Sequence, residues 1–235
     1  MKINEEWWHK LGKGTTWIDI SQPLDHKIAT WPNDTPFSYE RAVTKERSGS
    51  VNIGKIAMSL HTGTHVDAPF HFDNEGNGIL DLDLNVFIGK ARLIDVTHCQ
   101  ESIGPKAFEA LDLETFPPRV LLRTSLPNDR ERFPEKIPYL EPDIAVLLKE
   151  KGVRFIGIDA PSVDPLDSKA LPAHHALFEH GIHILENVML DRLAPGNYEF
   201  VALPLPLADA DGSPVRAAVR PLYGKEEHDA GKESE

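Results

Sequence analysis

One short histidine-rich stretch constrains this chain more than any other feature: HTGTHVDAPFHF at residues 61–72. In a straight strand that rises about 3.3 Å per residue, His61 and His65 would lie about 13 Å apart. Both side chains can reach one metal ion, at about 2.1 Å, only if the chain curls between them. Gly63 makes a tight curl easier, because glycine adopts left-handed conformations without steric cost. The stretch therefore predicts a curled loop after a strand that ends near Leu60, with side chains converging inward.

A second histidine-rich stretch, HHALFEHGIH at residues 174–183, is followed by Glu186, and the two stretches hold seven of the 11 histidines. Imidazole nitrogens and carboxylate oxygens form the ligand set of zinc and related divalent ions. Spacing alone leaves another interpretation of the second stretch open, namely a polar helix face and its exit. The remaining histidines are expected to be ordinary hydrogen-bonded residues: His9, His26, His98 and His228.

The two stretches together predict a two-metal site. One ion could be held by His61, His65 and Asp67, and a second could share Asp67, because a carboxylate has two oxygens. The second ion would need another histidine and another carboxylate, and residues 174–186 offer both. The pattern differs from the HExxH motif of zinc proteases, since that motif needs Glu beside the first histidine and position 62 is Thr.

Composition bounds the class of protein. The 235 residues include 37 Asp and Glu against 25 Lys and Arg, for a formal net charge of -12, and 40% are hydrophobic. Without repeats or linkers, we predict a single domain over residues 1–235, with a flexible tail at 225–235. The acidic balance argues against nucleic-acid and anionic-membrane partners. With no apolar run of about 20 residues, no secretory signal and Cys99 as the one cysteine, we expect a cytoplasmic protein.

Short runs rich in Val, Ile and Leu predict strands, which outnumber the predicted helices. In residues 51–60 the apolar alternation changes phase at Gly54, which predicts a bulge or tight turn there. The mixture favours an α/β or α+β class, with a mixed sheet or barrel and a few covering helices. Strands are expected at residues 17–20, 91–96, 119–124, 154–159, 182–185, 198–203 and 215–219, and helices at 105–111, 142–152 and 172–180.

In addition to these patterns, the sequence resembles the metal-dependent cyclase/formamidase family. The resemblance extends from about residue 16 to residue 224. It implies a single α/β domain of the cyclase-like, swivelling β/β/α type, with a mixed-sheet, barrel-like core and a few flanking helices. The residues that carry it are HTGTHVDAPFHF at 61–72, GIDAPSVDPLDSKALPAHH at 157–175 and ILEN at 184–187, with WIDISQPL near the start and Trp31 in an ATWP turn.

The resemblance also implies roles for individual residues. Asp67 matches a bridge between two zinc ions, His71 matches an acid/base histidine, and Trp31 matches an aromatic residue that contacts the substrate's ring. His175 competes with His174 as a ligand, and the spacing to the downstream carboxylate favours His174. Histidine and carboxylate ligands also accept manganese or cobalt. The residues that match the zinc ligands are His61, His65, Asp67, His174 and Glu186.

The formamidases of this family imply an activity, the hydrolysis of N-formyl-L-kynurenine to L-kynurenine and formate in tryptophan degradation. Metal-activated water would attack the formyl carbon, His71 would pass a proton to the leaving aniline nitrogen, and Trp31 would stack on the aryl ring. The implied partners are this small molecule and a second copy of the chain, in a homodimer. The alternatives are a related enzyme acting on another aryl amide or a lactam such as isatin, and a non-catalytic metal-binding module. The complete ligand set and the additional histidine argue against the latter.

Several residues near the motifs keep two interpretations. Asp159, Ser162 and Asp164 could orient a ligand histidine, or they could form a turn through backbone hydrogen bonds, which is the preferred interpretation. Phe70 and Phe72 could line a pocket, although core packing is expected for at least one of them.

Overall fold

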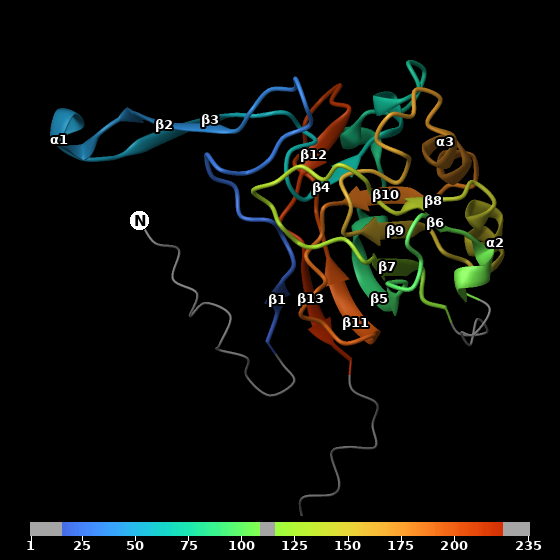
Figure 1. The fold of residues 1–235 in the computed structure, drawn as a ribbon. Coiled ribbons are helices and arrows are strands. Elements are labelled where there is room, and N and C mark those ends of the chain that lie inside the picture. Colours follow the sequence, from blue (N-terminus) through green and yellow to red (C-terminus); the bar gives the residue numbers. More distant parts are fainter. Residues whose placement is uncertain (1–15, 109–115, 223–235) are drawn as a thin grey trace, which may run out of the picture.

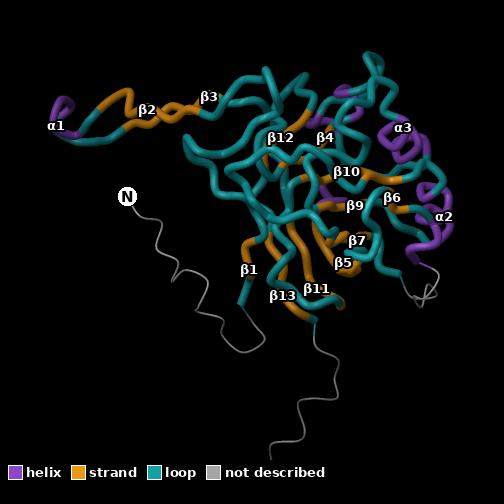
Figure 2. The backbone as a smooth tube through the Cα atoms, viewed as in Figure 1, coloured by secondary structure: helices purple, strands orange, loops and turns teal. Residues whose placement is uncertain are grey.

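A nine-stranded mixed sheet forms the body of the protein (Figures 1 and 2). The computed structural model describes residues 16–108 and 116–222, so the expected tail at 225–235 lies outside the described residues. The strand order is β1-β13-β11-β5-β7-β9-β10-β4-β12. The central strands β5, β7, β9 and β10 run parallel, and the outer strands pair antiparallel. The sheet curls, which confirms the predicted α/β fold with a mixed, barrel-like core.

Most of these strands lie at or beside the predicted apolar runs. Two other pairs stand apart from the large sheet, β2 (Ser38–Val43) with β3 (Ile53–Ala57) and β6 (Ser102–Ile103) with β8 (Tyr139–Leu140). The strands of the large sheet are β1 (Ile18–Asp19), β4 (His65–Asp67), β5 (Ile88–Asp95), β7 (Arg119–Arg123), β9 (Phe155–Ile158), β10 (His183–Glu186), β11 (Gly196–Val201), β12 (Gly212–Pro214) and β13 (Ala218–Pro221).

The alternation of apolar side chains along the central strands builds two cores, one on each face of the sheet. In β7, Leu121 points into the inner core, which the curled sheet encloses, while Val120 and Leu122 point into the outer core. Helices α2 (Ile144–Glu150) and α3 (Pro172–Glu179) cover the outer core, as the helices expected at 142–152 and 172–180 predicted. Among the described residues, no helix is long and apolar enough to cross a membrane.

The shorter elements correct two expectations. Residues Pro105–Phe108 form a 3₁₀ turn, and the rest of the helix expected at 105–111 lies outside the described residues. Of the strand expected at 215–219, only residues 218–219 belong to a strand, β13. Val215 forms an isolated bridge with Pro204, and Ala217 bonds to Ile20 and Ser21. Further 3₁₀ turns are η2 (Pro69–His71), η3 (Ile79–Asp81) and η4 (Leu84–Phe87).

The ribbon of β2 and β3 projects away from the body and carries the short helix α1 (Lys45–Ser48) at its tip (Figure 1). The register of the ribbon shifts between Arg41 and Val43, on the strand opposite Gly54. The predicted irregularity therefore lies beside Gly54, as expected, but in β2 and not in β3. A Cβ at Gly54 would lie 2.5 Å from Cε2 of Tyr39, so a larger residue there would displace the Tyr39 ring.

The turn before β4 makes the curl that the sequence predicts. Gly63 has a φ of 70°, and a Cβ on it would lie 2.9 Å from Cδ2 of Leu24. The Thr64 hydroxyl donates to the Asn187 carbonyl at 2.6 Å, which ties the turn to the end of β10. Residues 65–67 then pair with β10 and β12, so they form a strand where the sequence predicted a continuing loop.

We expect Gly63→Ala to lower the free energy of unfolding by about 2–4 kcal/mol, because it adds a steric clash to left-handed backbone strain. Gly152→Ala is the matched control: Gly152 has a φ of 76°, and nothing lies within 4 Å of its Cβ position. That variant should lose about 1 kcal/mol, from strain alone. Urea denaturation at one protein and metal concentration measures both changes, and equal losses would contradict the packing argument.

Candidate metal centre

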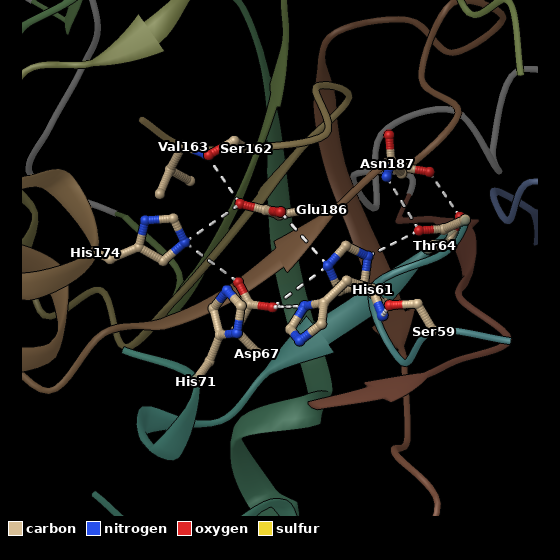
Figure 3. A network of polar contacts seen from close by, with 12 residues as sticks. Ser59, His61, Thr64, Asp67, His71, Ser162, Val163, His174, Glu186 and Asn187 are labelled. Carbon is tan, nitrogen blue, oxygen red and sulfur yellow. Dashed lines mark hydrogen bonds and ion pairs between the residues drawn. The ribbon is translucent and has the colours of Figure 1, made fainter. Parts of the chain in front are cut away.

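Strand register brings three of the predicted ligands together, of which Figure 3 labels Asp67 and Glu186. In the antiparallel pair of β4 and β10, Glu186 lies opposite His65, and Leu185 lies opposite Val66. Leu185 and Val66 are buried in the inner core, so the neighbouring polar side chains project from the other face of the sheet. His65 Nε2 lies 3.3 Å from Asp67 Oδ1 and 3.5 Å from Glu186 Oε2.

Two further predicted ligands reach the same point from outside this strand pair (Figure 3). His61 precedes the glycine turn, and its Nδ1 lies 3.0 Å from Asp67 Oδ1. His174, buried in the first turn of α3, places Nε2 3.5 Å from Asp67 Oδ2 and 3.7 Å from Glu186 Oε1. Both oxygens of Asp67 therefore face imidazole rings, which is the geometry that a bridging carboxylate requires.

Hydrogen bonds fix which nitrogen of two rings faces the cluster. His65 Nδ1 pairs with the Gly63 carbonyl at 2.8 Å, and His174 Nδ1 pairs with Asp164 Oδ2 at 2.7 Å. A carbonyl or carboxylate can only accept, so each Nδ1 carries a proton, and in the neutral form of each ring Nε2 presents the lone pair. Both rings are therefore set up as Nε2 donors to a metal.

The buried polar atoms of the cluster fit a cation. His65 Nε2 and both oxygens of Asp67 are buried and have no hydrogen-bond partner among the residues that the structure describes. Burial and the nearby Asp67 charge raise the pKa of Glu186 well above its usual range. Burial opposes the charged forms of His61 and His174, yet bonds to carboxylates raise the pKa of each to about 10. The buried side chains of the cluster therefore favour a positive charge between them. A set of histidine and carboxylate ligands suits a divalent metal ion.

Two sets of three ligand atoms, each set within 4.8 Å, share Asp67. One set adds His65 and Glu186, and the other adds His61 and His71. The His71 ring lies 3.9 Å from the His61 ring and is partly exposed, and burial lowers its pKa. Its position suits a metal ligand as well as an acid/base group, so the metal content of a His71 variant distinguishes the two.

Asp211 is a member of the site that the sequence did not reveal. Its Oδ2 lies 2.9 Å from His61 Nε2 and 3.7 Å from His71 Nδ1. The hydrogen bond with His61 lowers the pKa of Asp211 to about 2. Asp211 reaches the site because the next residue, Gly212, pairs with Asp67 in the ladder of β12 and β4. Its surroundings, DADGSP, resemble an ordinary turn, so no local signal marks it.

The other described histidines do not reach the cluster. His175 is exposed and packs edge-on against Phe72, with ring centroids 5.4 Å apart. His180 Nδ1 bonds to the Ala176 carbonyl at 2.8 Å near the end of α3. His183 lies beside Phe87. His9 and His228 are outside the described residues.

The GIDAPSVD segment divides between the two interpretations. Asp164 accepts the backbone N–H groups of Ala173 and His174 as well as the His174 ring, so it both begins α3 and orients a candidate ligand. For Asp164, the preferred turn-only interpretation is therefore wrong. Ser162 makes the expected turn bond to the backbone of Asp164, and Asp159 accepts hydrogen bonds from Thr124.

A cavity of about 410 Å³ opens over the cluster, with His61, His65, His71, His174 and Glu186 among its lining residues. Two loops also line it, the lower loop (residues 22–34) and the upper loop (residues 124–134). The Ala29 amide donates to the Arg130 carbonyl at 2.7 Å, and Trp31 meets Phe133 edge-on at 5.1 Å. Trp31 is 37% exposed, so this aromatic pair forms a wall that a ligand can contact.

Phe70 and Phe72 follow neither of their two expectations. Phe70 is 40% exposed, and neither residue belongs to the buried cores or to the lining of the cavity. Phe72 packs against the rings of His174 and Phe178, at 5.4 and 5.8 Å between centroids. It therefore supports α3 from the side, where it helps to hold His174.

Comparison with known proteins agrees with the fold. The Cyclase family model matches residues 18–165. The kynurenine formamidase of Bacillus cereus (strain ATCC 14579) is 64% identical over 210 residues, which cover 89% of this chain and 100% of that protein. A predicted metal-dependent hydrolase from Bacillus stearothermophilus superposes with a TM-score of 0.73 at 28% identity, over 87% of this chain and 97% of that one.

Isatin hydrolase A from Labrenzia aggregata shares the fold, with a TM-score of 0.74 at 22% identity over 87% of this chain and 93% of that one. The fold and the cluster define the class of protein, an α/β half-barrel with a histidine–carboxylate centre suited to a metal. Together with the extent of the sequence match, they establish that the chain belongs to the Cyclase family.

We expect Asp67→Asn to weaken metal binding by more than about tenfold, because a neutral amide replaces the carboxylate that both sets of ligand atoms share. Metal analysis after gel filtration measures the loss. Asp129→Asn is the matched control, since Asp129 lines the same cavity but lies outside the two sets of ligand atoms. A wild-type metal content in Asp67→Asn would mean that the cluster is not the metal site.

Asp159 generates a prediction about pH. Burial raises its pKa from 3.8 to about 7. Between these values the folded state holds a proton that the unfolded chain has released, so the stability of the fold falls as the pH rises. As the pH rises from about 5 to about 7.5, we expect the free energy of unfolding of Asp159→Asn to gain about 2–3 kcal/mol relative to that of the wild type. Urea denaturation across this pH range measures the difference. If the free energies of unfolding of the wild type and the variant changed in parallel with pH, the raised pKa of Asp159 would be contradicted.

Proposed function

We propose that this protein is a kynurenine formamidase, which hydrolyses N-formyl-L-kynurenine to L-kynurenine and formate. The observation that carries the proposal is the 64% identity, over 89% of the chain, to the kynurenine formamidase of Bacillus cereus. The geometry supports it, because the histidine–carboxylate cluster lies within a cavity that an aromatic pair borders. The cytoplasmic location expected from the sequence stays a prediction.

The proposed cofactor is zinc, two ions per subunit. The donor set of imidazole and carboxylate supports zinc, and the shared position of Asp67 supports two ions. A bound divalent metal supplies Lewis acidity and lowers the pKa of water from 15.7 toward about 7. The proposed ligands are His61, His65, Asp67, His174 and Glu186.

His71 is the proposed acid/base group. Its ring borders the cavity and lies beside the cluster, so it can take a proton from attacking water and deliver it to the leaving aniline nitrogen. Asp211, 3.7 Å from His71 Nδ1, favours the protonated ring through its negative charge. Because a single side chain accepts and donates this proton, both transfers take place within the cavity. Trp31 and Phe133 present ring edges and faces to the aryl group of the substrate.

We expect His71→Ala to keep its metal and to lose about 10²–10⁴-fold in kcat on N-formyl-L-kynurenine, because general acid/base assistance disappears while the five proposed ligands remain. Steady-state kinetics with parallel metal analysis measures both quantities. Loss of metal from the variant would make His71 a ligand, and near-normal turnover would remove it from the mechanism.

His175→Ala is the matched control for this variant, since His175 is an exposed histidine outside the cluster and should keep wild-type turnover. Isatin, tested beside N-formyl-L-kynurenine, distinguishes the alternative reaction on a lactam. Turnover of isatin without turnover of the formamide would overturn the proposed substrate but not the hydrolase class. Metal-dependent turnover of either amide would exclude a non-catalytic module.

We also propose a homodimer assembled through the β2–β3 ribbon. Tyr39 and Ile56 lie opposite each other in the ribbon and are 60% and 57% exposed. A two-stranded ribbon with exposed apolar side chains gains stability when a partner covers it. We expect sedimentation equilibrium to give twice the chain mass of 26.2 kDa, and Ile56→Glu to shift the mass toward the monomer. A monomeric wild type would contradict the proposal.

A further inference from the structure

Hydrogen bonds, an ion pair and a ring contact anchor the upper loop above the candidate metal centre. At its start, the Thr124 amide and hydroxyl donate to the buried Asp159 carboxylate, at 3.0 and 2.7 Å. In its middle, Arg130 forms a two-point ion pair with Asp25 of the lower loop, at 2.8 and 2.9 Å. Near its end, Phe133 packs against the lower loop. These contacts hold the backbone of the upper loop in place at the cavity before a ligand arrives.

Within the described residues, two side chains of this loop carry polar groups without a partner. Arg130 and Arg132 supply the guanidinium groups among the described residues that line the cavity, and Arg130 is already paired. Arg132 has no ion pair or side-chain hydrogen bond within the described parts of the chain. Asn128 also lines the cavity, and its buried Oδ1 has no hydrogen-bond partner. A buried acceptor without a partner costs free energy that a ligand donor can recover.

These two groups are complementary to an α-amino acid. A guanidinium binds a carboxylate through two parallel hydrogen bonds. An amide oxygen accepts a hydrogen bond from an ammonium group, which carries three donors. Arg132 is exposed at the mouth of the cavity, whereas the metal cluster lies at its buried end. A substrate with an aryl formamide at one end and a zwitterionic amino-acid group at the other would match both ends.

We propose that Arg132 and Asn128 form a subsite for the amino-acid group of the substrate, with Arg132 binding the α-carboxylate and Asn128 accepting a hydrogen bond from the α-ammonium. This inference rests on the proposed function and gives it a specificity: the enzyme selects aryl formamides that carry an amino acid over neutral ones. The subsite is remote from the reacting carbon, so its loss raises KM and leaves kcat nearly unchanged.

The test compares N-formyl-L-kynurenine with 2-formamidoacetophenone, which keeps the ring, ketone and formamide but lacks the amino acid. For the metal-loaded Arg132→Gln enzyme, we expect kcat/KM on N-formyl-L-kynurenine to fall about 10- to 100-fold, through KM, with no change on 2-formamidoacetophenone. Asn128→Ala should lose about 3- to 10-fold on the same substrate alone. Arg154→Gln is the matched control, because Arg154 immediately precedes β9, away from the cavity-lining residues, and is exposed.

Calorimetric titration of L-kynurenine into the same metal-loaded proteins gives a readout that does not depend on turnover. Weaker binding to Arg132→Gln, with unchanged binding to Arg154→Gln, is the expected result. Equal losses on both formamides, or wild-type kinetics in Arg132→Gln, would overturn the subsite. If the wild type hydrolyses neither formamide, the proposed function fails, and the titration alone decides the subsite: equal L-kynurenine binding by the wild type and Arg132→Gln, or no binding by either, overturns it.

Discussion

The buried carboxylate of Asp67 is the group on which the arrangement of the site depends. It is 3% exposed, and neither oxygen has a hydrogen-bond donor within the described parts of the chain. A carboxylate in such a place is costly unless positive charge lies beside it. Three imidazole rings lie within 3.0–3.5 Å of its oxygens, and their proximity holds the pKa of Asp67 well below the usual range despite burial. The residues around Asp67 therefore supply the cation that this charge needs, a proton in the free protein or a metal in the loaded one.

The fold delivers this arrangement through pairings between distant segments. The register of β4 and β10 sets Glu186 against His65, and the ladder of β12 and β4 brings Asp211 to the opposite side of the cluster. The Asp164 carboxylate at the start of α3 turns His174 toward the same point. The upper loop leaves the carboxyl end of β7, beside the carboxyl ends of β9 and β10, where open α/β sheets hold their ligands.

Local patterns in the sequence predicted what depends on short-range chemistry. Apolar runs marked the central strands, and Gly63 between two histidines predicted the curl, because only a turned chain brings His61 and His65 together. The ladder that draws residues 65–67 into a strand, and the one that places Asp211, depend on partners far along the chain, so neither leaves a local signal. The unpartnered Arg132 likewise emerges only when the pairing of Arg130 with Asp25 is known.

The central claim is that the cluster around Asp67 holds metal, and anomalous X-ray diffraction at the zinc absorption edge from crystals of the zinc-loaded protein tests it most directly. The account predicts two peaks that share Asp67, one beside His65 and one beside His174, each about 2.1 Å from the Nε2 atom of its histidine. A single peak would contradict the two-metal assignment. Zinc bound only elsewhere, with these side chains hydrogen-bonded to water, would contradict the claim itself.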